Sequence, residues 1–309
     1  MDKNLNRSNY ERRMHQVIQY IDENISQPIN LEELAAVAHF SPYHFHRLFA
    51  AWANENLGDY IRRRRLELAS IYLISQPHLT VLSIALFVGF GSAEAFSRSF
   101  KQHTGYSPIQ WRQLKTAQYQ NSNLNQPHRN PHHDEKTIHD QNKDSYNPPE
   151  KEYIMKVNII QRDPVSVAYL RYTGPYGAAV GQFWAKTFMP WLKENGLCEK
   201  STYGIGHDDP SITSPDQCRY DACVEVPPDQ PLSGNPQRTT IPGGKYAVVE
   251  FKGKPDTIGD AWTDFFKNWL PSSGLQLDHR PCFEYYPSDM AYDSTTGKFT
   301  CQLCIPVNS

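Results

Sequence analysis

Length, composition and charge exclude several classes of protein. The chain has 309 residues, of which 39% are hydrophobic, and a formal net charge of −2. This length exceeds one ordinary core and favours two globular domains. No apolar run approaches the roughly 18–20 residues of a membrane span, and the first residues lack the apolar segment of a secretory signal. We therefore expect a cytoplasmic protein that does not associate with membranes.

Three helices are predicted at the start of the chain. Apolar residues recur on one stripe of residues 9–24, which predicts the first helix. Asn30 begins the second helix as its N-cap, with Glu33 three residues later as its capping-box partner. Ser41 as N-cap and Pro42 at the first helical position then begin a third helix.

The outward face of the third helix has the composition of a DNA-reading surface. Tyr43, His46 and Arg47 share this face, whereas Phe45 and Phe49 face inward. Arginine can bond bidentately to guanine, and histidine or tyrosine can contact base edges or phosphates. The same face equally suits the solvated surface of a small helical bundle. Residues 1–115 contain 13 Lys and Arg against 10 Asp and Glu, an excess too small to decide between the two.

A second copy of this unit, about 50 residues later, favours the DNA-reading interpretation. Residues 81–87 predict a short helix, Gly89 supplies a left-handed turn, and Ser92 caps the helix that follows. The outward positions of that helix hold Glu94, Ser97 and Arg98.

A long helix is predicted between the two copies. Residues 59–75 would span roughly 25 Å, enough to help hold two reading helices about 34–36 Å, or one duplex turn, apart. The chain could then enter two successive major grooves. The arginine run at 62–65 points in four directions around this helix, so we expect only one or two of the four to contact a phosphate, Arg62 among them. The other arginines are expected to be solvated or paired with acidic neighbours such as Glu55, Asp59 and Glu67.

Residues 84–112 carry the motifs of a known family. Their Ile-Ala, Gly-Phe, Phe-Ser-Arg-x-Phe-Lys and Gly-Tyr-Ser-Pro elements resemble the signature of the AraC/XylS family of transcription activators. The resemblance implies an all-α tandem helix-turn-helix domain, placed at 8–115, that binds double-stranded DNA. RNA polymerase is a further partner that such an activator implies. The base-reading residues that the resemblance implies are Tyr43, His46 and Arg47 in the first unit and Ala93, Glu94 and Arg98 in the second.

Residues 116–154 differ in character from the rest of the chain. They are rich in Asn, Gln, His, Pro and charge and lack apolar periodicity. Such a segment cannot bury enough apolar surface to offset the entropy lost on ordering. We therefore predict a flexible polar linker that joins the first domain to a second domain at 155–309.

The second domain is predicted to be α+β. A segment that repeats at a spacing of 78–79 residues indicates two strand-helix-strand-strand units in one antiparallel sheet arrangement. The predicted elements are strands within 157–172, a helix at 178–192 and strands at 202–206 and 220–226, followed by a strand at 245–252, a helix at 257–270 and strands at 281–286 and 299–307.

Glu284 stands among the aromatic residues of a late strand in this domain. A carboxylate between aromatic rings must be paired, protonated or available to a cation. Aromatic rings around a carboxylate suit a bulky organic cation, through cation–π attraction and charge. The alternative is an ordinary strand glutamate that faces water or pairs with an arginine such as Arg280.

Three motifs in this half resemble GyrI-like domains, the effector-binding half of some multidrug regulators. They are Gly-Pro-Tyr at 174–176, Ile-Pro-Gly-Gly-x-Tyr-Ala at 241–247 and Phe-Glu-x-Tyr at 283–286. The resemblance implies a small-molecule effector, with Glu284 as the acidic residue of its pocket. The implied pocket walls are Tyr176, Tyr203, Trp262 and Phe266.

Three other functions are compatible with parts of the sequence. Glu284 could act as a general base in a small-molecule hydrolase. One of the six cysteines could accept an alkyl group in damage repair, although none has a neighbour in sequence that would activate it. The second domain could instead bind another macromolecule. We expect no catalytic residues, metal or cofactor, because we find no Ser/His/Asp set, phosphate loop or metal-ligand cluster in the sequence.

Overall fold

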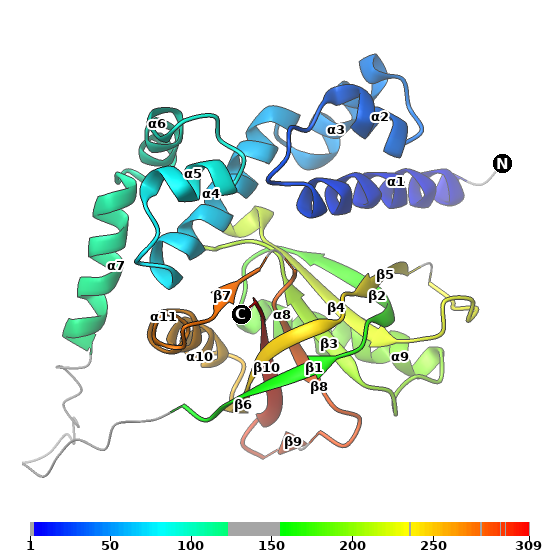
Figure 1. Cartoon of the computed structure of the whole chain (residues 1–309). Coiled ribbons are helices and arrows are strands. Elements are labelled where there is room, and N and C mark those ends of the chain that lie inside the picture. Colours follow the sequence, from blue (N-terminus) through cyan, green and yellow to red (C-terminus); the bar gives the residue numbers. More distant parts are fainter. Residues whose placement is uncertain are drawn as a thin grey trace, which may run out of the picture.

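The computed structural model describes residues 3–122, 155–234, 236–278, 280–290, 292–293 and 295–308. Helices α1 to α7 form the N-terminal domain, and a curled sheet flanked by helices forms the C-terminal domain below it (Figure 1). The N-terminal helices are α1 (Lys3–Glu23), α2 (Leu31–Val37), α3 (Pro42–Ala53), α4 (Leu57–Ser75), α5 (Val81–Phe87), α6 (Ala93–Thr104) and α7 (Pro108–Ser122).

The predicted caps begin the helices of both helix-turn-helix units. The Asn30 side chain accepts a hydrogen bond from the Glu33 N–H at 2.8 Å, and the Ser92 hydroxyl accepts one from Ala95 at 3.1 Å. Gly89 adopts a φ of 87° in the turn between α5 and α6. A Cβ there would lie 2.8 Å from the Arg65 guanidinium carbon, so the turn needs glycine for both conformation and space.

Three helix boundaries of the N-terminal domain differ from the sequence prediction. Helix α1 begins at Lys3, six residues before the predicted start. Helix α4 begins at Leu57, because Asn56 caps it by accepting a hydrogen bond from the Asp59 N–H. Helix α7 continues to Ser122, past the predicted domain end at residue 115. The rest of the predicted linker, 123–154, lies outside the described residues.

The predicted α+β class of the C-terminal domain is confirmed. Its strands pair in the order β1-β6-β10-β8-β3-β4-β2-β5, with antiparallel pairing throughout this path, and β7 and β9 add to β10. The strands are β1 (Val157–Arg162), β2 (Val165–Thr173), β3 (Thr202–Gly206), β4 (Arg219–Glu225), β5 (Gln237–Ile241), β6 (Gly244–Gly253), β7 (Gln276–Leu277), β8 (Phe283–Tyr286), β9 (Tyr292–Asp293) and β10 (Lys298–Asn308).

Both long helices of this domain contain a π-helical segment that the sequence did not predict. The first runs through α8 (Ala178–Phe183), η1 (Trp184–Phe188) and α9 (Met189–Glu194). The second runs through α10 (Ile258–Asp264), η3 (Phe265–Trp269) and α11 (Leu270–Ser272). The two π segments occupy equivalent places in the duplicated units, and a short 3₁₀ turn, η2 (Pro215–Gln217), precedes β4.

The two domains pack directly on each other through α4. Tyr72 and Leu73 of α4 share one apolar cluster with Phe265 and Leu270 of the C-terminal domain. The Tyr72 hydroxyl donates a 2.9 Å hydrogen bond to the Leu277 carbonyl oxygen. The domain contact therefore does not depend on the segment 123–154.

A buried charge network centred on Asp208 reinforces this contact. The Asp208 side chain has 0% exposure, and its Oδ1 lies 3.3 Å from Arg63, 3.2 Å from Arg64 and 2.8 Å from Arg219. Arg63 and Arg64 belong to α4, whereas Arg219 begins β4. Burial by itself raises the pKa of Asp208, but the Arg219 and Arg64 guanidinium groups outweigh it and hold that pKa well below its usual range.

The arginine run therefore has a different role from the one predicted. Only Arg62 matches the expected exposure, at 56%, and it pairs with Asp59. Arg63 and Arg64 are 6% and 15% exposed, so they are not solvated. The predicted pairs with Glu55 and Glu67 do form, but the interdomain partner Asp208 and the α1 partner Asp22 were not predicted. Arg65 instead donates to backbone carbonyls of Ile25, Gln27 and Gly89, which ties the two helix-turn-helix units together.

We predict that Asp208→Asn lowers the free energy of unfolding by about 3–5 kcal/mol, because it leaves buried guanidinium charge without its partner. Urea unfolding followed by tryptophan fluorescence measures this. Asp59→Asn is the matched control, since Asp59 pairs with the exposed Arg62, and it should cost less than about 1 kcal/mol. If the two substitutions lower the free energy of unfolding equally, the buried network does not stabilise the fold more than an exposed ion pair does.

Candidate DNA-binding and effector sites

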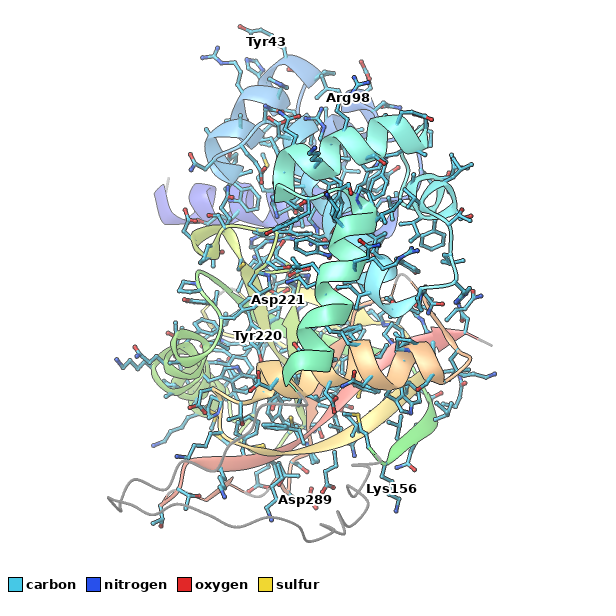
Figure 2. The ribbon with its side chains drawn as sticks, turned by 90° about the vertical axis from the view of Figure 1, so that its left-hand side faces the viewer. Tyr43, Arg98, Lys156, Tyr220, Asp221 and Asp289 are labelled. Carbon is cyan, nitrogen blue, oxygen red and sulfur yellow. The ribbon has the colours of Figure 1, made fainter. Side chains whose placement is uncertain are left out.

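The predicted DNA-reading residues lie on the open side of the N-terminal domain. Helices α3 and α6 face away from the sheet domain, and Tyr43 and Arg98 stand at the end of the molecule remote from Tyr220 and Asp221 (Figure 2). Tyr43 is 69% exposed. The exposed predicted residues are Tyr43, His46, Arg47, Arg62, Glu94 and Arg98, and the half-buried ones are Ala93 and Ser97.

Contacts within each reading helix organise its surface. The Arg47 guanidinium lies over the Tyr43 ring, 6.0 Å from its centroid, and donates a long 3.5 Å hydrogen bond to its hydroxyl. In α6, hydrogen bonds from its own backbone and from Ser92 lower the pKa of Glu94. Glu94 therefore keeps its charge at the N-terminus of α6, where negative charge is favoured, besides being available to DNA.

Glu284 lies in a large cavity and is held by three hydrogen-bond donors. Its Oε2 accepts from the hydroxyls of Tyr220 at 2.7 Å and Tyr286 at 2.8 Å, and its Oε1 accepts from the Trp262 indole N–H at 3.1 Å. Burial raises the pKa of Glu284, and these three hydrogen bonds partly offset that rise. The side chain is thus a buried hydrogen-bond acceptor held by three uncharged donors.

Both alternatives for Glu284 that the sequence left open are excluded. The residue is only 8% exposed, so it does not face water as an ordinary strand glutamate does. Arg280 instead pairs with Asp278, with a 2.8 Å hydrogen bond, and donates to the carbonyl oxygens of Gly243 and Lys245.

Three of the four predicted wall residues line the cavity with Glu284. Trp262 and Phe266 stack with ring centroids 5.8 Å apart, and Tyr176 lines another part of the wall. The prediction for Tyr203 is wrong, because its side chain lies on the face of the sheet opposite to the cavity. It packs there against Phe283 and Tyr285, since side chains alternate between the faces of a strand.

Four residues of this site were not among the predicted site residues. Tyr220, Tyr286 and Trp184 line the cavity, and Trp184 donates to the Tyr220 hydroxyl at 3.3 Å. Gly204 lies opposite Glu284 across β3 and β8. A Cβ on Gly204 would lie 2.5 Å from the Glu284 Oε2 and closer still to the Tyr220 hydroxyl, so this glycine makes room for the carboxylate and its partner.

Comparisons with known proteins identify both halves. Residues 34–114 match the model of a helix-turn-helix domain, and residues 155–308 match that of a GyrI-like small molecule binding domain. The SPbeta prophage-derived regulator YosT of Bacillus subtilis (strain 168) is 30% identical over 154 residues, which are 50% of this chain and 99% of YosT. Regulatory protein SoxS of Escherichia coli (strain K12) is 33% identical over 103 residues, which are 33% of this chain and 95% of SoxS.

The chain belongs to the AraC-type helix-turn-helix regulators, and it carries a GyrI-like domain. This AraC-type regulator therefore combines a DNA-binding domain with a small-molecule-binding domain. In the described residues no helix has the length and apolarity needed to cross a bilayer.

A third relative bears on the cysteines of this regulator. The bifunctional transcriptional activator and DNA repair enzyme AdaA of Bacillus subtilis (strain 168) is 39% identical over 98 residues, which are 32% of this chain and 46% of AdaA. The match thus spans less than half of AdaA. Burial raises the pKa of five thiols, which are those of Cys218, Cys223, Cys282, Cys301 and Cys304. Because alkyl transfer needs a thiolate, these five residues are poorly suited to it.

We predict that Tyr220→Phe and Tyr286→Phe each raise the pKa of Glu284 by roughly one pH unit, because each removes a hydrogen bond that stabilises the carboxylate. Carbon NMR of protein labelled at glutamate side-chain carboxyls, assigned with Glu284→Gln, measures this pKa. Tyr285→Phe is the matched control, since Tyr285 packs on Tyr203 on the other face of the sheet. A pKa of Glu284 that is unchanged in both test variants would contradict the assigned hydrogen bonds.

Proposed function

We propose that this regulator places α3 and α6 in two successive major grooves of its operator. The observation that supports this most is that both reading faces are open on the side remote from the C-terminal domain (Figure 2). DNA can then be bound while the domains stay packed together. Arg47 and Arg98 are the proposed base readers, because an exposed guanidinium on the outward face of such a helix can bond to guanine. Arg62 is the proposed phosphate contact.

The experiment for this proposal is a selection from a randomised duplex library with the full chain, followed by titration of the selected duplex. Arg47→Ala and Arg98→Ala should each weaken specific binding by about 1–3 kcal/mol at matched salt and relax selection at one position. Arg238→Ala is the control, since it removes an exposed charge from the C-terminal domain. Selection of no motif, or unchanged specific affinity in both variants, would contradict the proposal.

We also propose that the Glu284 cavity binds a bulky organic cation as effector. A buried carboxylate beside the Trp262 indole supports this class of ligand, because charge attraction and cation–π attraction act together there. The hydrolase alternative is less favoured, because the donors from Tyr220, Tyr286 and Trp262 engage both carboxylate oxygens. Contact with RNA polymerase stays a prediction.

Isothermal titration calorimetry of benzyltrimethylammonium binding to the full chain tests this assignment. Glu284→Gln should weaken binding at least about tenfold, which corresponds to the loss of one charge-assisted interaction. Affinity for the wild type should rise with pH, because burial raises the pKa of Glu284 and only its deprotonated form attracts a cation. The Glu284→Gln variant should lack that pH dependence. Equal affinities of the two proteins would rule out Glu284 as the cation's partner.

The packing of the domains supports a route by which an effector could alter DNA binding. The Tyr176 hydroxyl donates to the Arg219 carbonyl oxygen at 2.6 Å and accepts from the Asp208 N–H at 3.1 Å. Asp208 in turn contacts Arg63 and Arg64 of α4. A cavity wall is thus linked to the helix that joins the two reading units, and an effector with different affinities for two domain arrangements would shift the balance between them.

A further inference from the structure

The cavity at Glu284 extends beyond the C-terminal domain. Its volume is about 1720 Å³, and its lining includes Asp22 of α1 and Arg64, Ile71 and Ile74 of α4. Pockets for drug-sized molecules usually have volumes of about 300–1,000 Å³. A compact ligand at Glu284 would therefore leave unfilled the part of the cavity that the DNA-binding domain lines.

An aromatic and apolar wall connects Glu284 with α4. The Trp262 indole bonds to Glu284, and its ring lies nearly parallel to that of Phe266, at an interplanar angle of 23°. Phe266, Ile71 and Ile74 pack against the same interdomain apolar cluster, and all three line the cavity. Helix α4 packs on η3, the segment that carries Phe266. The wall is thus continuous from the carboxylate to the DNA-binding domain.

The charges along the cavity favour one orientation of a ligand in it. Lys267 of η3 and Lys115 of α7 both line the cavity. Burial and the charge of Lys115 lower the pKa of Lys267 to about 8, although Asp209 acts in the opposite direction. Positive charge near these lysines repels a cation. Asp22 and Asp208 also line the cavity, but both pair with Arg64, whereas Glu284 is held by uncharged donors and can attract a cation.

We propose that the cavity binds an elongated amphipathic cation whose head lies at Glu284 and whose apolar tail follows Trp262 and Phe266 to Ile71 and Ile74 of α4. This inference rests on the proposed function, which assigns the cationic group to Glu284. It adds that the DNA-binding domain forms part of the effector site. Ile71 and Ile74 then determine which tail length is bound, and the tail touches the helix that carries both reading units.

A series of alkyltrimethylammonium ions, from tetramethylammonium to dodecyltrimethylammonium, tests the inference in the full chain. Affinity should rise about threefold to fourfold for each added methylene that is buried, and the rise should continue to the longest tails. Ile71→Ala should weaken dodecyltrimethylammonium binding roughly threefold to tenfold and leave tetramethylammonium binding unchanged. Ile71→Trp should end the rise at a shorter tail, because the larger side chain fills the α4 end.

Leu82→Ala is the matched control, because Leu82 is 50% exposed on α5, outside the cavity. Circular dichroism and thermal unfolding establish that each variant is folded, and Ile74→Ala replaces any Ile71 variant that is not. If affinity depends on tail length in the same way in the wild type and in the folded Ile71 and Ile74 variants, the inference is wrong. The proposed function would still hold in that case, provided that binding of the short cations depends on Glu284. If the Glu284→Gln variant binds both short-tailed and long-tailed cations as tightly as the wild type, the proposed function is wrong, and the inference fails with it.

Discussion

The carboxylate of Asp208 is the point at which the two domains depend on each other. It is fully buried and lies between guanidinium groups from α4 on one side and from β4 on the other. A buried ionic cluster of this kind adds little net stability over an apolar contact, but it is costly to break one member at a time. We infer that it fixes the relative position of the domains more sharply than apolar packing alone would. The apolar cluster around Tyr72 and Phe265 buries hydrophobic surface between the domains, and the ion pairs determine how the domains are aligned.

This arrangement assigns helix α4 two roles. One side of it packs on the helices of the two DNA-reading units, and the other side packs on η3 and α11 of the GyrI-like domain. The reading faces point away from the second domain, so regulation by simple obstruction of the DNA surface does not fit the geometry. A change in how the second domain holds α4 is the route that we propose instead, because α4 lies between the two helix-turn-helix units. Such a change requires no signal to pass through residues 123–154.

The sequence predicted local structure and motifs well and contacts between domains poorly. Caps at Asn30 and Ser92 act within three residues, so their hydrogen bonds follow from spacing alone. Tyr286 could have been added to the site, because residues two apart in a strand share a face, and Tyr286 stands two residues after Glu284. Tyr203 could not have been excluded in this way, since its face depends on its pairing with Tyr285 across β3 and β8. Tyr220 and Gly204 had no such signal, since their place depends on the pairing of β3 with β4 and β8. Asp208, the interdomain partner of Arg63 and Arg64, lies about 145 residues away in sequence, beyond the reach of any local pattern.

We propose that the Glu284 cavity and the DNA-binding surface are coupled through the packed domains. The most direct test measures the affinity of the full chain for its selected duplex with and without saturating dodecyltrimethylammonium, and then the affinity for this cation with and without the duplex. Coupling through a shared equilibrium requires the two affinities to change by the same factor. We predict equal factors that differ from one, and that both factors fall to one in Glu284→Gln. An affinity for DNA that is unchanged at saturating cation would rule out this coupling.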